Sequence, residues 1–94
     1  MAVYVDAAKH PYRGALWCHL LADTVEELHT FARRLGLKPH WFQDHRQSRP
    51  HYDLAPSLRA KAVALGAREI TDEEVVELLR RYRKEHLDAA GQTG

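Results

Sequence analysis

The sequence contains a single cysteine, Cys18, so no disulfide bond can form within the chain. Cys18 lies in the apolar stretch ALWCHLL, which favours packing over thiol chemistry. No stretch approaches the roughly 18 consecutive apolar residues that indicate a membrane span, and the first residues lack the basic leader of a secretory signal. We therefore expect a soluble, cytoplasmic protein without a membrane partner.

An excess of either charge is also absent. Fourteen Lys and Arg residues against thirteen Asp and Glu residues leave a formal net charge of +1, which is too small for the electrostatic field of a general nucleic-acid binder. The basic run RRYRKEH follows the acidic start of a predicted helix, which is the charge order that the helix dipole favours. The charges therefore argue against a nucleic-acid partner.

Specific catalytic motifs are missing as well. The sequence has no P-loop, no glycine-rich dinucleotide fingerprint, no paired CxxC and no HExxH. It is instead rich in histidine, with seven residues in 94, so its net charge changes steeply below about pH 6.5. The candidate chemistry therefore rests on the histidines and on the carboxylates near them.

Length and composition predict one small domain. Ninety-four residues with 45% hydrophobic and 29% charged residues are ordinary for a globular unit with a single core. We expect one α/β domain over residues 1–88 and a frayed C-terminal tail over residues 89–94.

Several stretches have the composition of short strands. Residues 2–5 (AVYV) are apolar up to Asp6 and predict a buried strand. A polar turn through Pro11 and Gly14 leads to residues 15–21 (ALWCHLL), in which both alternating faces are largely apolar. The remaining extended segments are residues 40–43 (HWFQ), 51–54 (HYDL) and 67–70 (AREI).

Three stretches predict helices. The stretch from Thr24 to Gly36 has a capping box at its start, apolar residues at helical spacing and a glycine stop. A second helix begins at Pro56 and ends at Gly66. A third begins at Thr71 with another capping box and has these residues along one side: Val75, Leu79, Tyr82 and His86.

The order of these elements predicts the fold class. A strand, a helix and a strand follow one another between residues 51 and 70, which suggests a parallel crossover. We expect an α/β fold in which a small single-domain sheet of four to five short, partly parallel strands packs against three helices.

The stretch RPHYDLAP holds the first candidate site. His51 and Asp53 are two residues apart, so on a strand both side chains point to the same face, while Tyr52 points to the other. An imidazole and a carboxylate form the minimum half-site for a divalent metal such as zinc or manganese, or an acid and base pair. The alternative is a histidine that is simply held by its neighbouring carboxylate.

Further candidates follow other predicted elements. Asp6 comes directly after the first strand, and ligands of parallel α/β sheets gather at the carboxyl ends of strands. Asp6 could therefore meet Asp53, or it could simply begin a turn. His19 shares a predicted strand face with Trp17 and could form a second half-site with Asp23. Both of these residues also have structural alternatives, as a packed core group and as a helix cap.

Two more features are less diagnostic. His29 borders the apolar stripe of the first helix, where it could face a site at the sheet rim or form a structural hydrogen bond. Arg46 and Arg49 lie in the loop DHRQSR and are candidates for binding an anion. The other histidines lack a carboxylate at diagnostic spacing, and we assign them to surface, loop or core-edge positions: His10, His40, His45 and His86.

Five stretches together resemble one known family: VYVD (3–6), CHLLADTVEELHTFARRLGL (18–37), WFQ (41–43), PHYDL (50–54) and AVALGAREI (62–70). The chain is similar to the domain of unknown function 4031 family. The resemblance implies a small α/β domain of bacteria or their phages, without an established activity. These candidates fall inside the matching stretches: Asp6, His19, Asp23, His29, His51 and Asp53.

The sequence leaves two functions open. In the first, a His and Asp cluster at the strand ends binds a divalent metal or a phosphate-bearing small molecule, and the protein could act as a metal-dependent hydrolase. In the second, the protein is a non-enzymatic interaction module or homodimer, in which the His and Asp groups are structural and Trp41 and Phe42 are anchors.

Overall fold

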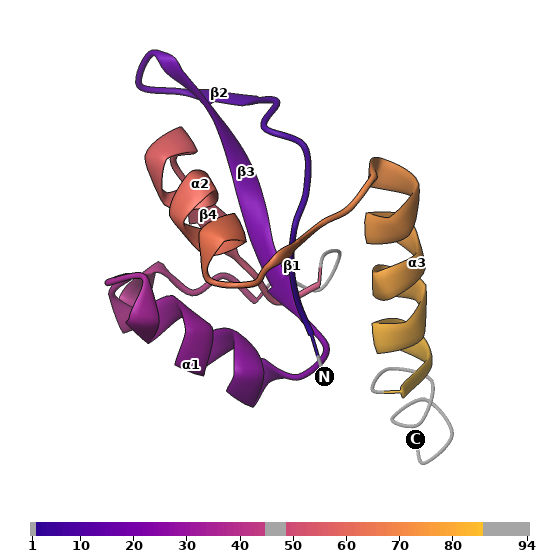
Figure 1. Cartoon of the computed structure of the whole chain (residues 1–94). Helices are drawn as coiled ribbons and strands as arrows, with labels where there is room; N and C mark the ends of the chain where they lie inside the picture. Colours follow the sequence, from indigo (N-terminus) through magenta and orange to yellow (C-terminus); the bar gives the residue numbers. More distant parts are fainter. Residues whose placement is uncertain (1, 45–48, 86–94) are drawn as a thin grey trace.

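The structure is a computed structural model that describes residues 2–44 and 49–85 (Figure 1). The sheet in this part of the chain has five strands: β1 (Val3–Val5), β2 (His10–Tyr12), β3 (Ala15–Ala22), β4 (Tyr52–Leu54) and β5 (Arg68–Glu69). The helices are α1 (Val25–Arg34), α2 (Pro56–Ala64) and α3 (Asp72–Arg83), with a 3-10 turn η1 (Pro39–Trp41). The predicted α/β fold with short, partly parallel strands and three helices is confirmed. The predicted tail over 89–94 lies outside the described residues.

Strand β3 is the centre of the sheet. β1 and β4 both run antiparallel to β3, and Leu20 pairs with Val5 of β1 and with Tyr52 of β4. Because one residue has one partner at each strand edge, β1 and β4 lie on opposite edges of β3. β5 runs parallel to β1. The path from β4 through α2 to β5 is therefore a parallel crossover, as the element order predicted.

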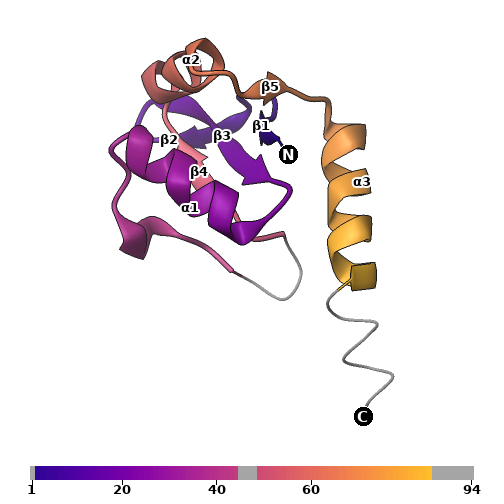
Figure 2. The ribbon, with the colours of Figure 1, turned by 60° about the horizontal axis from the view of Figure 1, so that its bottom comes forward.

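The hydrophobic core lies between the sheet and the helices α1 and α2, which both pack against β3 and β1 (Figure 2). Cys18, Leu20 and Ala22 alternate along β3 and are at most 3% exposed. Burial raises the pKa of the Cys18 thiol to about 11, so the thiol stays protonated and acts as a small apolar side chain, as its sequence context predicted. Leu28 of α1 and Ala62 of α2 complete this layer.

The segment HWFQ does not form the strand that its composition predicted. Residues Pro39–Trp41 form η1, in which the backbone N–H of Phe42 donates to Pro39 O at 3.1 Å. Proline has a restricted φ and no N–H for a ladder, so it favours the turn over a strand. Among the described residues, this segment pairs through a single bridge between Gln43 and His51.

Strand β2 occupies residues that the sequence predicted as a turn. Tyr12 pairs with Ala15 of β3, and the two residues between them have positive φ angles of 48° at Arg13 and 75° at Gly14. This is the backbone geometry of a two-residue hairpin turn, but Arg-Gly lacks the asparagine or aspartate that usually marks such turns. The missed strand matters because it places His10 beside Trp17 across the ladder.

Helix α3 stands apart from α1 and α2 in both views (Figures 1 and 2). The capping box between Thr71 and Glu74 is present, as predicted. The buried residue of α3 is Leu78, at 5% exposed, which the predicted stripe did not include. Among the residues that the structure describes, no helix is long and apolar enough to cross a membrane.

Candidate metal centre

The site is built around a cross-strand pair on β3 and β4. His19 and Asp53 are register partners in the antiparallel ladder, so their side chains share one face of the sheet. His51 directly precedes β4 and is 8% exposed. The face comes from alternation: Tyr52 and Leu54 point into the core, at 2% and 0% exposed, which turns His51 and Asp53 to the opposite face.

Asp6 fixes the position of His19. The backbone N–H of His19 donates to Asp6 Oδ1 at 2.6 Å, and Nδ1 of the ring lies 2.7 Å from Asp6 Oδ2. Burial alone would raise the pKa of Asp6, but the hydrogen bonds from His19 outweigh it and the pKa lies below its ordinary value. The same contact raises the pKa of His19 above its ordinary value, against the opposing effect of burial.

The ring of His51 is oriented by the backbone. Its Nδ1 lies 2.8 Å from the carbonyl oxygen of Arg49. A carbonyl oxygen only accepts, so Nδ1 of His51 carries the proton. By the same reasoning the ionised Asp6 carboxylate accepts the Nδ1 proton of His19. In the neutral form of each ring, the lone pair is therefore on Nε2, and both Nε2 atoms lie on the side of Asp53.

His19, His51 and Asp53 each offer one metal-ligand atom, and these atoms all lie within 4.8 Å of one another. Nε2 of His19 is 3.9 Å and Nε2 of His51 is 3.6 Å from Asp53 Oδ1. Both distances exceed the limit of about 3.2 Å for an N–H to O hydrogen bond. Ligand atoms about 2.1 Å from a tetrahedral zinc ion are about 3.4 Å apart, close to the separations in this group. The rings of His19 and His51 meet edge to face, with centroids 4.8 Å apart.

A second group of metal-ligand type shares His19. It comprises Asp6, His10 and His19, whose ligand atoms lie within 4.8 Å of one another, and the rings of His10 and His19 have centroids 4.4 Å apart. The sequence predicted a surface, loop or core-edge position for His10 and did not place it in a cluster with His19. The signal was hidden because His10 reaches His19 only through the pairing of β2 with β3.

Other neighbours complete the surroundings of the cluster. Gln43 donates from Nε2 to Asp53 Oδ2, so the segment after η1 holds the carboxylate from its far side. The cluster opens into a cavity of about 820 Å³. The cavity is lined by His10, Tyr12, Arg13, Trp17, His19, Leu37, His40, Trp41, Gln43, His51, Asp53 and Leu58.

The arrangement differs from the predicted rim at the strand ends. His19 and Asp53 lie within strands, whereas Asp6 and His51 flank the ends of β1 and β4. β1 and β4 point the same way but are separated by β3. Asp6 and Asp53 therefore do not meet directly but lie on either side of the His19 ring.

Asp23 and His29 are not in either group of metal-ligand type among the described residues. Asp23 accepts hydrogen bonds from the backbone N–H of Ala2 at 2.8 Å and from the Tyr4 hydroxyl at 2.7 Å, which fasten the start of β1. His29 Nδ1 lies 2.7 Å from the hydroxyl of Tyr52, and its ring packs edge to face on Phe42. The structural hydrogen bond that the sequence left open describes His29, whereas the helix-cap alternative for Asp23 is wrong, because Thr24 is the N-cap of α1.

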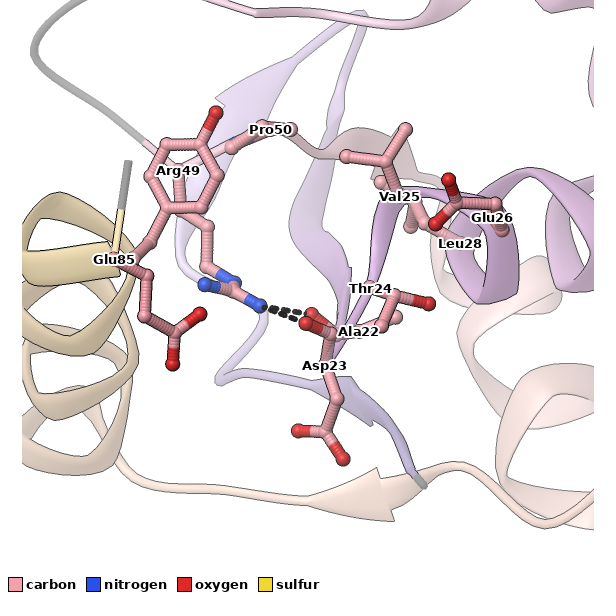
Figure 3. A pocket seen from close by; sticks show the side chains of 10 residues that line it. Ala22, Asp23, Thr24, Val25, Glu26, Leu28, Arg49, Pro50 and Glu85 are labelled. Carbon is pink, nitrogen blue, oxygen red and sulfur yellow. Dashed lines mark hydrogen bonds between the residues drawn. The ribbon is translucent and has the colours of Figure 1, made fainter. Parts of the chain in front are cut away.

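Arg49 is buried rather than presented in a loop. Its guanidinium donates to the carbonyl oxygens of Ala22, of Asp23 at 3.0 Å and of Leu78 at 3.2 Å, as Figure 3 shows for the first two. It also packs over the ring of Tyr82, with 5.3 Å from Cζ to the ring centroid. These contacts join α3 to the end of β3. The guanidinium of Arg49 therefore binds backbone carbonyl oxygens, whereas the sequence suggested that it binds an anion. Arg46 lies outside the described residues.

The fold and the cluster define a class of protein, a small α/β domain with His and Asp side chains gathered on a sheet face. Within that class, the family described as protein of unknown function (DUF4031) matches residues 3–82, and the chain belongs to this family. The resemblance noted in the sequence is thereby confirmed. No curated protein and no solved structure matches the chain.

Proposed function

We propose that the protein binds a divalent transition metal, zinc or manganese, through Nε2 of His19, Nε2 of His51 and the carboxylate of Asp53. One observation carries the proposal: both rings have Nδ1 held by an oxygen acceptor, so that Nε2 of each ring lies on the side of Asp53. Two imidazole nitrogens with a carboxylate are a common ligand set for these metals.

The contacts behind the ligands support the same role. Asp6 accepts the Nδ1 proton of His19 and the carbonyl of Arg49 accepts that of His51. Metal-binding histidines almost always donate their second N–H to a carboxylate or a carbonyl, because this fixes the tautomer and the ring orientation. Asp6 is 2% exposed, so this support is built into the core side of the site rather than added at the surface.

With three protein ligands, a metal held here would keep a further position for water or a ligand. An open position is typical of catalytic zinc sites, whereas structural sites are closed by four protein ligands. A phosphate-bearing ligand could bind there, and in the enzymatic version the metal would supply the activation of water for hydrolysis. The proposal is therefore a metal-dependent ligand site, with phosphoester hydrolysis as the reaction to assay once metal binding is established.

Calorimetric titration of the full chain with zinc and with manganese at neutral pH tests the metal proposal. We expect one site per chain, lost in a His51→Ala, Asp53→Ala double variant and kept in His40→Ala, a histidine outside both groups. Circular dichroism should show that the double variant remains folded. Several weak sites that survive the double substitution would contradict the proposal.

A second candidate function, self-association, is supported by exposed apolar side chains. Tyr12, Leu16 and Trp41 are 53%, 51% and 46% exposed, and aromatic residues are common anchors at interfaces. Phe42, by contrast, packs against His29 and Tyr52. A sizing column run with wild type, Trp41→Ala and the exposed control Val76→Ala tests this function. A dimer that only Trp41→Ala dissociates would support it, and a wild-type monomer would rule it out.

A further inference from the structure

We infer that the cavity beside the cluster binds a small ligand with both a planar aromatic ring and a phosphate group, of the class of a nucleoside monophosphate. This inference rests on the proposed metal site. The cavity of about 820 Å³ falls within the range of roughly 300–1,000 Å³ that is usual for small-molecule sites.

The cavity is lined by buried polar and apolar side chains and has exposed aromatic side chains at its mouth. His51 is 8% exposed, whereas Trp41 and Tyr12 at the edge are 46% and 53% exposed. The edge residues come from two segments that are distant in sequence, the β2–β3 hairpin and η1. The cavity therefore brings aromatic side chains of these two segments beside the proposed metal ligands.

The aromatic side chains at the mouth are held in place before any ligand arrives. The indole N–H of Trp17 donates to the carbonyl oxygen of Tyr12 at 3.0 Å, and the two rings pack edge to face with centroids 5.2 Å apart. Trp41 is supported by the ring of His40 and by Lys38. The exposed indole of Trp41 offers a stacking surface for a nucleobase, because every base has a π face.

The charges at the mouth favour an anionic group on the ligand. Asp53 is the one carboxylate among the described residues that line the cavity, and the proposed metal neutralises it. Arg13 also lines the cavity, and its position is set by the hairpin turn, in which its φ is 48°. A phosphate could bind the metal and the guanidinium together while the base stacks at the mouth.

The combination selects the ligand class. A purely apolar ligand would not use Arg13 or the metal, and a free phosphate would not use the indole rings. A long nucleic acid is disfavoured by the net charge of +1, because polymer binding depends on many phosphate contacts. A single nucleotide has one base that can stack on the aromatic rings and one phosphate that can bind the metal and Arg13.

The test is a tryptophan-fluorescence and calorimetric titration of the zinc-loaded full chain with adenosine monophosphate. Adenosine and ribose 5-phosphate serve as the two halves of the ligand, and a metal-free sample as the reference. We expect saturable binding that is at least about tenfold weaker for each half and in the metal-free sample. Trp41→Ala and Arg13→Gln should each weaken nucleotide binding about tenfold while zinc affinity stays unchanged, and Val76→Ala should weaken neither.

The outcomes separate the two proposals. If zinc does not bind the wild type at one site, the metal proposal fails before any nucleotide is added. If zinc binds but the nucleotide does not, or binds equally with and without metal, the ligand inference is overturned and the metal proposal stands. Much tighter binding of an oligonucleotide than of the monophosphate would also overturn it, in favour of a polymer.

Discussion

His19 and Asp53 are paired across β3 and β4, and Nε2 of His19 lies 3.9 Å from Oδ1 of Asp53. The core sets this register. Tyr52 and Leu54, on either side of Asp53, are 2% and 0% exposed, and a slip of one residue would turn them to the cavity and Asp53 into the core. The polar cluster is therefore a consequence of where the apolar residues of β4 must go.

Loss of a core anchor of β4 should weaken the fold and the metal site together. We expect Leu54→Ala to lower the free energy of unfolding by about 2–5 kcal/mol, because it leaves a cavity in the core, and to weaken zinc binding. Urea unfolding and zinc titration measure the two effects. Leu16→Ala, at a residue that is 51% exposed, is the control and should change stability by less than about 0.5 kcal/mol. Unchanged zinc affinity in Leu54→Ala would show that the register of β4 does not control the metal site.

Asp6→Asn should weaken metal binding without removing a metal ligand. The substitution removes the carboxylate that accepts the Nδ1 proton of His19, and loss of such a contact usually costs about 10–100-fold in metal affinity. The pKa of His19 should fall, because the hydrogen bond to Asp6 is the main cause that raises it. A competition titration with a zinc chelator and an NMR titration of the His19 ring measure these changes. A His19 pKa that does not move would contradict the assigned contact.

The stability of the metal-free protein should depend on pH through the same pair. The pKa of Asp6 is lowered from 3.8. The ionised Asp6 carboxylate therefore contributes to the free energy of unfolding above pH 3.8, and this contribution is lost as the pH falls through the folded pKa. The pKa of His19 is raised from 6.5, so its contribution is present below that value and is lost as the pH rises through the folded pKa. Urea unfolding in the presence of a chelator should therefore show the largest contribution of the Asp6 and His19 pair to stability between pH 3.8 and 6.5. The Asp6→Asn profile should be flatter, and an identical profile would refute this assignment.

Metal affinity should have the opposite pH dependence to the stability contribution of His19. A metal binds the neutral ring, so protonated His19 must release a proton first. Because the pKa of His19 is raised, zinc affinity should still increase as the pH rises past 6.5, the ordinary value. Titrations in buffers of different ionisation enthalpy count the released protons. Zinc binding that releases no proton near that pH would argue against His19 as a ligand.

Arg49 should stabilise the attachment of α3. Its buried guanidinium donates to carbonyl oxygens at the end of β3 and at Leu78 of α3, and hydrogen bonds to a charged group contribute about 1.5–3 kcal/mol each. We expect Arg49→Gln to lower the free energy of unfolding by about 2–4 kcal/mol. Hydrogen exchange should show faster exchange in α3.

The matched control for this prediction is Arg80→Gln. Arg80 is 75% exposed and pairs with Glu77 on the surface of the same helix, so the substitution should change stability by less than about 1 kcal/mol. Equal effects of the two substitutions would show that the buried contacts of Arg49 do not matter.

Local patterns were sufficient for the helices and for part of the site. The capping residues Thr24 and Thr71 begin α1 and α3 as predicted, because a cap depends on neighbours three residues away. The face shared by His51 and Asp53 also followed from sequence, since alternation is a property of any strand. The segment after Pro39 was misjudged because its aromatic residues were given more weight than the proline before them. The hairpin at Arg13 was misjudged because Arg-Gly lacks the asparagine or aspartate that usually marks such turns.

The sequence by itself determined which residues form the three α-helices, where β1, β3, β4 and β5 lie, and which histidine and aspartate share the face of β4, since each depends on residues close together in the chain. Only the tertiary structure decided which groups meet. It brought Asp6 to His19, added His10 to the cluster, and placed Asp23, His29 and Arg49 in structural contacts. Those contacts depend on strand partners and register, which are set by burial of the whole core.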